Sequence, residues 1–263
     1  MKYQDYNGYR YFWAEVEGLE KGKSYCYYYL VDGTKKVGDP YARLVLDPYS
    51  DKWLDKLPEG CPAYPYDRFD DTMLAVYNSD IDNYDWQYND AYSIPDHDKL
   101  IIYELLVRDF DGANRTADGT FDNVSHRLLY LKELGVNAIE LMPVMEFNGN
   151  NSWGYNTNFY MAPDKAYGSP ADLRALIDNI HRHGMAVILD IVFNQSDGLH
   201  PWYQMYDIKN NPFYNEKAPH DYSVLNDWNQ SNPLVEQHWA DVIRYWICLL
   251  YTSPSPRDYA ASR

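Results

Sequence analysis

The sequence predicts a parallel α/β fold for residues 100–247. Three short apolar segments, residues 100–107, 137–142 and 186–191, alternate with segments whose apolar residues recur at helical spacing. A short apolar run that follows a helix is typical of a strand buried in a parallel sheet. Strand–helix alternation of this kind begins both an eight-stranded barrel and an open doubly wound sheet. The first strand is not followed by a glycine-rich phosphate loop, which disfavours a nucleotide-binding open sheet.

Three helices are expected in this region. The first covers residues 121–134, the second begins at Ser169-Pro170 with Asp172 placed to complete a capping box, and the third begins at Asn232-Pro233. In the third helix the apolar residues recur on one face: Val235, Trp239, Val242 and Trp246.

The part of the chain ahead of residue 100 has a different character. Residues 1–46 predict a small antiparallel β unit, with strands at 9–17 and 25–31 and a return strand near 35–37 after the hairpin signal Asp32-Gly33. So few strands cannot bury a core alone, so we interpret them as the C-terminal part of a β-sandwich module. Residues 47–99 are rich in proline and have no sustained period, and we interpret them as an extended connector.

Composition limits the classes of partner. The formal net charge of −16 repels nucleic acid and anionic membranes, so we expect neither as a partner. The 28 Tyr and 8 Trp residues suit planar ligands such as sugar rings, although most of them must fill half-buried strand faces. The three cysteines predict no disulfide framework. No apolar run is long enough to span a membrane and no signal peptide follows Met1, so the chain as written is expected to be cytoplasmic.

The third apolar segment ends in a run of polar residues. Asp190 lies within it, and Asn194, Gln195, Ser196 and Asp197 follow. In parallel α/β folds ligands bind at the carboxyl ends of strands, which makes these residues candidates for a site. The alternative is that they satisfy backbone groups in a turn.

Six motifs, in order along residues 100–247, resemble the α-amylase superfamily, glycoside hydrolase family 13. Asp-Ile-Val-Phe-Asn-Gln at 190–195 is similar to the signature of the family's third barrel strand. The other five resemble the first strand, the second strand, the loop and helix start that follow it, and the segment ahead of the fourth strand: Ile-Tyr-Glu-Leu at 102–105, Ala-Ile-Glu-Leu-Met-Pro at 138–143, Trp-Gly-Tyr-Asn at 153–156, Tyr-Gly-Ser-Pro at 167–170 and Leu-Asn-Asp-Trp-Asn at 225–229.

This resemblance implies a fold and a substrate. The expected architecture is part of a (β/α)8 TIM barrel, its first three strand–helix units, preceded by part of a β-sandwich module. Residues 37–42 resemble the end of the module that precedes the barrel in branching enzymes and pullulanases. The implied activity is retaining hydrolysis or transfer at α-glucosidic bonds of starch, glycogen or pullulan.

The resemblance also implies roles for individual residues. Tyr155, and less strongly Trp153, would stack on a sugar ring, and Asp190 would organise the site near the nucleophile. Gln195 stands where the family usually has His, and it can exchange hydrogen bonds with a sugar hydroxyl but cannot become charged. Asn194 and Asp227 match positions of calcium ligands, so calcium is a candidate ion, although two ligands are far fewer than six to eight.

The residues that would carry out catalysis are not found in the sequence. Retaining cleavage needs a carboxylate nucleophile and a carboxylic acid about 5–5.5 Å apart, and in the family these follow the fourth and fifth strands. Residues 248–263 instead contain Ser253-Pro254-Ser255-Pro256, which cannot form a buried strand, and resemble read-through at the end of an assembled reading frame. The chain is therefore predicted to be an inactive, truncated enzyme. A non-catalytic glucan-binding protein is the alternative, and an unrelated barrel enzyme is disfavoured because a phosphate site is missing.

Overall fold

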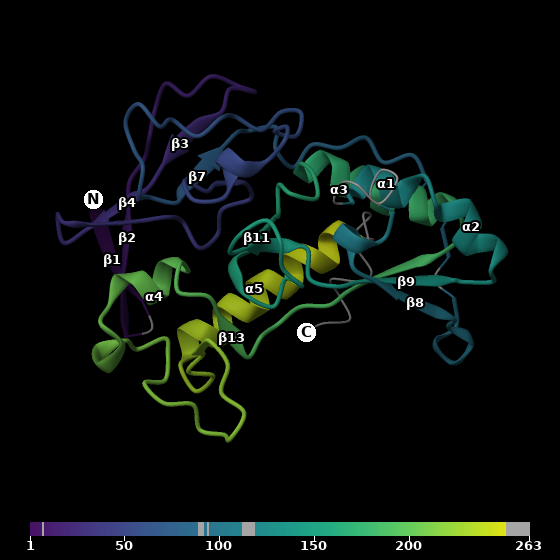
Figure 1. The fold of residues 1–263 in the computed structure, drawn as a ribbon. Coiled ribbons are helices and arrows are strands. Elements are labelled where there is room, and N and C mark those ends of the chain that lie inside the picture. Colours follow the sequence, from purple (N-terminus) through teal and green to yellow (C-terminus); the bar gives the residue numbers. More distant parts are fainter. Residues whose placement is uncertain (7, 89–91, 94, 112–118, 251–263) are drawn as a thin grey trace.

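The fold is known from a computed structural model, which describes residues 1–6, 8–88, 92–93, 95–111 and 119–250. Its centre is a three-stranded parallel sheet of order β12-β9-β8. The strands are β8 (Ile102–Leu105), β9 (Ala138–Leu141) and β12 (Ala186–Leu189). Figure 1 shows the helices α1, α2 and α3 on the same side of β8 and β9. All three predicted parallel strands are confirmed, in the predicted strand–helix order.

The helices begin where the sequence predicts, but the first is interrupted. It is divided into α1 (Phe121–Ser125) and α2 (Leu128–Glu133), because Arg127 leaves helical geometry at φ −105° and ψ 1° and binds Asp111 through its guanidinium at 2.6 Å. The apolar spacing continues across this break, so the pattern could not show it. Helix α3 (Pro170–Arg182) has the predicted capping box.

The third predicted helix is α5 (Pro233–Leu250), and its predicted apolar face is buried. The amide of Leu234 donates to Oδ1 of Asn232, which confirms the predicted start. The helix continues to Leu250, past the predicted start of the non-native tail at residue 248, and residues 251–263 lie outside the described part of the chain, so the tail stays a prediction. No helix among the described residues is long and apolar enough to cross a membrane.

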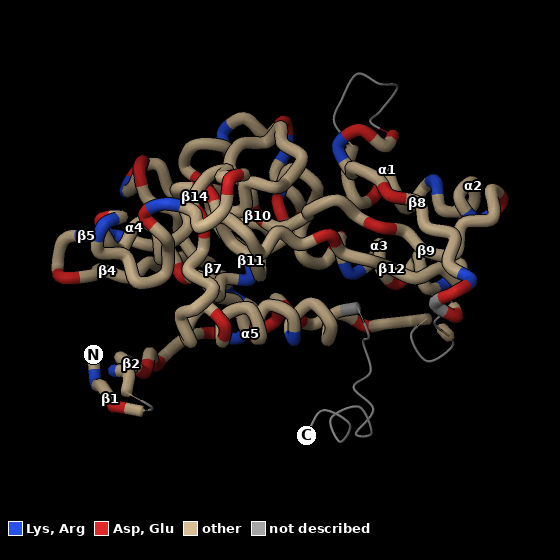
Figure 2. The backbone as a smooth tube through the Cα atoms, turned by 90° about the horizontal axis from the view of Figure 1, so that it is seen from below, with Lys and Arg blue, Asp and Glu red and all other residues tan. Residues whose placement is uncertain are grey.

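The N-terminal part forms small antiparallel sheets. The strands are β1 (Lys2–Tyr6), β2 (Tyr9–Trp13), β3 (Tyr25–Tyr27), β4 (Tyr29–Val31), β5 (Lys35–Val37), β6 (Val45–Leu46) and β7 (Leu74–Tyr77). The predicted hairpin at Asp32-Gly33 is present between β4 and β5, with φ values of +50° and +70°. The expected strand 9–17 ends at Trp13, and the expected strand 25–31 is divided in two. Figure 2 shows the exposed β1–β2 hairpin standing apart from the rest of the chain.

Two segments that we expected to lack strands contain them. Strand β7 lies inside the predicted connector 47–99 and pairs with both β3 and β6, so it is the central strand of that sheet. Strand β11 (Thr157–Pro163) lies between the second predicted strand and the second predicted helix, where the sequence indicated only a loop; it is buried at all seven residues and pairs with β10 (Met145–Phe147). These two- and three-stranded sheets do not establish a β-sandwich, which stays a prediction.

The long segment between β12 and α5 contains short elements. They are β13 (Gln195–Ser196), α4 (Pro201–Met205) and β14 (Asn226–Asp227), and β13 pairs antiparallel with β14. The remaining short helices are η1 (Asp51–Trp53), η3 (His97–Lys99), η4 (Val107–Asp109) and η6 (Ile208–Asn210). The main core lies between the parallel sheet, helices α1–α3, β11 and α5.

Candidate functional site

Three carboxylates lie on one face of the parallel sheet. Glu104 on β8 and Glu140 on β9 are directly in register, and Ile188 on β12 is in register with Glu140. Because side chains alternate between the faces of a strand, Asp190, two residues beyond Ile188, is placed on the same face. Leu141 points to the opposite face, which packs on the helices.

Tyr155 and Asp190 meet at the carboxyl end of this sheet. The phenol of Tyr155 donates to Oδ2 of Asp190 at 2.5 Å. Nε2 of Gln195 donates to the carbonyl of Tyr155 at 3.2 Å, and Nδ2 of Asn194 donates to Oε1 of Gln195 at 2.8 Å. The structure therefore brings together four of the six predicted site residues. Trp153 lies in the same loop as Tyr155 and is 64% exposed.

The loop that carries Tyr155 has a fixed backbone. Gly154 adopts φ +89°, and a Cβ at this position would lie 2.4 Å from the carbonyl oxygen of Pro143. Only glycine tolerates both the conformation and this close approach. The amide of Gly154 donates to Oγ of Ser152 at 3.0 Å, and the side chains of Ser152 and Asn156 are hydrogen-bonded. The loop geometry holds Tyr155 against Asp190.

The electrostatics of the site follow from this acidic face. Burial, and then the charges of Glu104 and Asp190, raise the pKa of Glu140. Burial, and then the hydrogen bond to Asp190, raise the pKa of Tyr155, so the phenol remains a donor at neutral pH. The face thus offers carboxylate acceptors and a phenol donor, which suits a ligand rich in hydroxyl groups.

Glu104 and Glu140 were not predicted from the sequence as members of this face. The signal was present, because the two strands read Ile-Tyr-Glu-Leu and Ala-Ile-Glu-Leu, with Glu at the same distance from the strand end. Aligning the two motifs and applying strand alternation would have placed both carboxylates beside Asp190.

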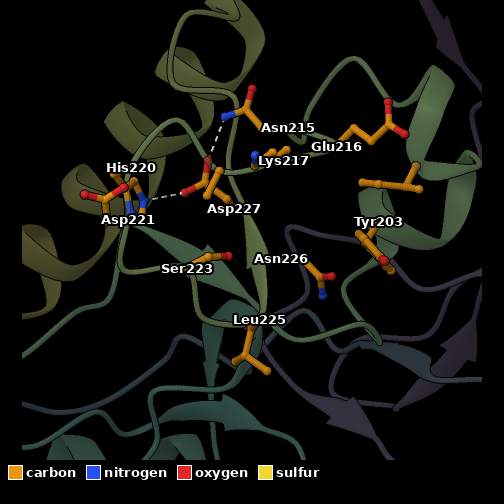
Figure 3. A pocket seen from close by; sticks show the side chains of 12 residues that line it. Tyr203, Asn215, Glu216, Lys217, His220, Asp221, Ser223, Leu225, Asn226 and Asp227 are labelled. Carbon is orange, nitrogen blue, oxygen red and sulfur yellow. Dashed lines mark hydrogen bonds and ion pairs between the residues drawn. The ribbon is translucent and has the colours of Figure 1, made fainter.

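Asp227 lies at a separate cavity of ≈ 550 Å³, drawn in Figure 3. Its Oδ1 accepts a hydrogen bond from Nδ2 of Asn215 at 2.7 Å, and its Oδ2 lies 3.0 Å from Nε2 of His220. Asn194 is not among the residues that line the cavity, although its carbonyl accepts from the amide of Trp228 at 3.1 Å.

These contacts do not fit the predicted calcium ion. Both carboxylate oxygens of Asp227 already have partners, and the amide of Asn194 is directed to Gln195. Within the described residues, no group of three or more His, Cys, Asp or Glu side chains is placed to hold a metal. Calcium needs six to eight oxygen ligands, so its binding here stays a prediction without structural support.

Comparisons with known proteins agree with the resemblance seen in the sequence. Residues 104–222 match the family model "Alpha amylase, catalytic domain". Malto-oligosyltrehalose trehalohydrolase of Saccharolobus solfataricus is 32% identical over 237 residues, which cover 89% of this chain and 37% of that protein. Chloroplastic isoamylase 1 of Arabidopsis thaliana is 29% identical, over 86% of this chain and 33% of the relative.

A solved structure extends the comparison to the fold. A putative α-amylase from Salmonella typhimurium superimposes with a TM-score of 0.65 at 25% identity, covering 90% of this chain and 34% of that one. The chain thus spans about a third of the length of these relatives. The predicted resemblance to the α-amylase superfamily is confirmed, and the partial barrel stays a prediction.

Proposed function

Residues 104–222 carry the catalytic-domain pattern of the α-amylase family, and from this premise we propose that the chain is part of a glycoside hydrolase acting on α-glucans. The observation that carries the proposal is the Tyr155–Asp190 hydrogen bond at the carboxyl ends of the parallel strands, with Gln195 beside it. The reaction class is retaining hydrolysis or transfer at α-glucosidic bonds of starch, glycogen or pullulan.

The chemistry of the site supports a neutral sugar as ligand. The Tyr155 ring offers an apolar face to a pyranose, and Asp190 accepts hydrogen bonds from hydroxyl groups. Gln195 both donates and accepts, and it stays neutral at every pH. An uncharged glucan is not repelled by the net charge of −16, whereas a phosphorylated ligand or nucleic acid would be.

The extent of the matches bears on the type of enzyme. The matches to the trehalohydrolase and the isoamylase extend over most of this chain and beyond the catalytic-domain match. The part of the chain ahead of residue 104 thus also has counterparts in relatives of this kind, which supports a layout with a β module ahead of the catalytic-domain pattern. Amylase, pullulanase and branching activities remain alternatives within the proposal, because none of the site residues separates them. A cytoplasmic location stays part of the prediction.

The proposal is tested with maltoheptaose and soluble starch. We expect the 263-residue chain to bind maltoheptaose with millimolar affinity, about 4 kcal/mol, because a partial cleft makes few contacts. We expect no release of reducing ends from starch or pullulan, because no nucleophile–acid pair is assigned in this chain. Turnover that survives repurification would contradict the inactivity, and absence of binding would contradict the sugar site.

A non-catalytic glucan-binding protein is the second candidate, favoured by the lack of an assigned catalytic pair. The two candidates differ in the gene beyond codon 247. An intact Arg-x-Asp motif followed by a Glu motif there supports the enzyme, and a genuine stop codon supports the binding protein.

A further inference from the structure

Two buried histidines lie inside an aromatic cluster that contacts the candidate site through Tyr160 and Gln195. His200, the residue before α4, and His238 on α5 have no exposed surface, and their ring centroids are 6.1 Å apart. Besides Tyr41, which packs on His238, five aromatic rings contact this pair: Tyr160, Trp202, Tyr214, Trp228 and Trp239. We refer to the two histidines and these five residues as the imidazole cluster.

The imidazole nitrogens are almost without hydrogen bonds. Nδ1 of His200 accepts from the amide of Trp202 at 3.2 Å, so in the neutral ring the proton is on Nε2. Neither Nε2 of His200 nor either nitrogen of His238 has a hydrogen-bond partner within the described part of the chain. An imidazolium at either position would be a buried charge without an acceptor, which is costly. The packed cluster therefore requires both rings to be neutral.

The titratable groups around the cluster do not provide that acceptor. Tyr160 and Tyr214 face His200, and burial raises the pKa of both phenols, so they are neutral. Tyr41 packs on His238, and its phenol donates to Asp241 at 3.1 Å.

Among the described residues, Asp241 is the carboxylate whose charge favours protonation of His238, but it already accepts hydrogen bonds. It accepts hydrogen bonds from Arg244 at 3.0 Å and from Gln237 at 2.8 Å. Burial outweighs its charge and lowers the pKa of His238 to about 4. Burial, and then His238, lower the pKa of His200 well below its usual range.

The cluster supports the residues of the candidate site directly. The phenol of Tyr160 donates to the carbonyl of Gln195 at 2.7 Å and accepts from Nε1 of Trp228 at 3.3 Å. The amide of Trp228 in turn donates to the carbonyl of Asn194. Two backbone contacts at the start of β13 therefore come from members of the imidazole cluster.

We propose that His200 and His238 are positioning residues, which hold Gln195 in place while both rings are neutral and release it in mild acid by taking up two protons. The glucan-binding role of Gln195 rests on the proposed function, whereas the two-proton release rests on the cluster alone. An exposed histidine has a pKa of about 6.5, so below that pH an opened cluster binds protons that the closed cluster excludes.

The size of the effect follows from the number of protons. Each proton taken up on opening changes the opening equilibrium tenfold per pH unit, so two protons give about 100-fold per pH unit below about pH 6. Buried carboxyl groups elsewhere work in the opposite direction. Burial raises the pKa of Glu146 and Asp164, so the closed state keeps their protons and gains stability as pH falls. Acid-induced opening therefore cannot come from those two groups.

The experiment follows tryptophan fluorescence, because Trp202, Trp228 and Trp239 report on the cluster. The opening equilibrium is measured from pH 7.5 to 4.5 in the wild-type chain, in His238→Phe and in His126→Phe. His238→Phe keeps an aromatic ring and removes no hydrogen bond to any described residue, since neither nitrogen has a partner among them. His126 is an exposed histidine and provides the matched control.

We expect the equilibrium constant for opening to rise about 100-fold for each pH unit of acidification in the wild-type and the His126→Phe chains. In His238→Phe we expect a rise of about tenfold per pH unit. Equal steepness in wild type and His238→Phe overturns the proposal. Should His238→Phe fail to fold, the imidazole Cε1–H signals of the wild-type chain decide the question by NMR. The rings of His200 and His238 are expected to stay neutral in the closed state at pH 5.5. Titration of these two rings near pH 6.5 in the closed state would overturn the proposal.

A second arm separates this inference from the proposed function. Maltoheptaose binding is measured over the same pH range and is expected to weaken in parallel with opening. Binding that is unchanged while the cluster opens overturns the positioning role. If the chain opens with uptake of two protons and yet binds no maltoheptaose at pH 7.5, the result supports the role of the two histidines in holding β13. The same result counts against the proposed function.

Discussion

One lysine neutralises a group of buried acids where residue 51 meets residues 146 and 165. Nζ of Lys165 lies 2.8 Å from Oε1 of Glu146 and 3.2 Å from Oδ1 of Asp51, and all three side chains are at most 5% exposed. Burial alone would lower the pKa of Lys165, but Glu146, Asp51 and Asp164 outweigh burial and raise it. A lysine that holds its charge in this environment is a structural cation, not a base.

Lys165→Met is therefore predicted to cost about 3–5 kcal/mol of unfolding free energy, because it leaves buried carboxylates without a counter-charge. Lys99→Met, which removes one side of an exposed pair with Asp96, is the control and should cost less than about 1 kcal/mol. Urea denaturation measures both changes. Equal and small losses would show that the buried network contributes little to stability.

The pH dependence of this variant has a definite sign. The pKa of Asp164 is raised to about 7, above its unfolded value, so its contribution to stability is full below about pH 4 and is lost as pH rises through 7. Without Lys165 the remaining acids must stay protonated, which becomes harder as pH rises. The loss in Lys165→Met should be larger at pH 8 than at pH 5, and the reverse order would contradict the sign.

Tyr155 tests the candidate site at the same scale. Tyr155→Ala removes the ring and the bond to Asp190 and should weaken maltoheptaose binding about tenfold, the upper part of the range for one aromatic contact. Tyr155→Phe keeps the ring and should lose less. Tyr130→Ala, at an exposed tyrosine on α2, is the control and should bind as wild type. Chemical-shift titration measures all three, and an unchanged titration in Tyr155→Ala would remove Tyr155 from the site.

At the scale of elements, the capping box of α3 gives a clean prediction. Oγ of Ser169 accepts from the amide of Asp172 at 3.2 Å, and the Asp172 carboxylate accepts from the Ser169 amide at 2.8 Å. Ser169→Ala removes the first of these bonds and also the bond that Oγ of Ser169 donates to the Asp172 carboxylate at 2.8 Å, and it should cost about 1 kcal/mol. Thermal unfolding with Ser231→Ala, at an exposed serine, as the control measures the difference. No destabilisation relative to that control would mean that the cap is compensated elsewhere.

The helices and strands that were predicted correctly are those whose signals lie close together in the sequence. The three parallel strands and the starts of α3 and α5 were predictable because apolar periodicity and capping residues lie within a few positions of each other. Strand β7 was not predictable, since its partners are Tyr25–Tyr27 and Val45–Leu46, far away in sequence. Strand β11 was missed because it is buried on both faces and so has no alternation to detect.

In the candidate site, too, some residues were predictable from the sequence and others were not. Tyr155, Asp190 and Gln195 followed from motifs, and the structure brings them together. The dependence of Gln195 on Tyr160 could not be predicted, because a phenol that meets a backbone carbonyl 35 residues away leaves no pattern in the sequence.

At the scale of the whole molecule, the parallel sheet has open edges. In the order β12-β9-β8, the outer strands β8 and β12 each pair on one side only within the described residues. Apolar side chains are also exposed at Ile101 and Ile102 on or beside β8 and at Ile243 and Ile247 on α5, each between 41% and 57%. Open edges and exposed apolar groups promote pairing with other chains.

The net charge of −16 opposes association, and the balance depends on salt. Repulsion between exposed charges is screened beyond about 8 Å at physiological ionic strength, whereas apolar burial is not screened. We therefore predict association at physiological salt and less of it at low salt, measured by size-exclusion chromatography with light scattering. Ile102→Lys places a charge on the open face of β8 and should reduce association, whereas the exposed control Leu129→Lys on α2 should not. A monomer with a sharp two-state melt at both salt concentrations would mean that the three-stranded sheet is complete in itself, and the partial-barrel interpretation would then fail.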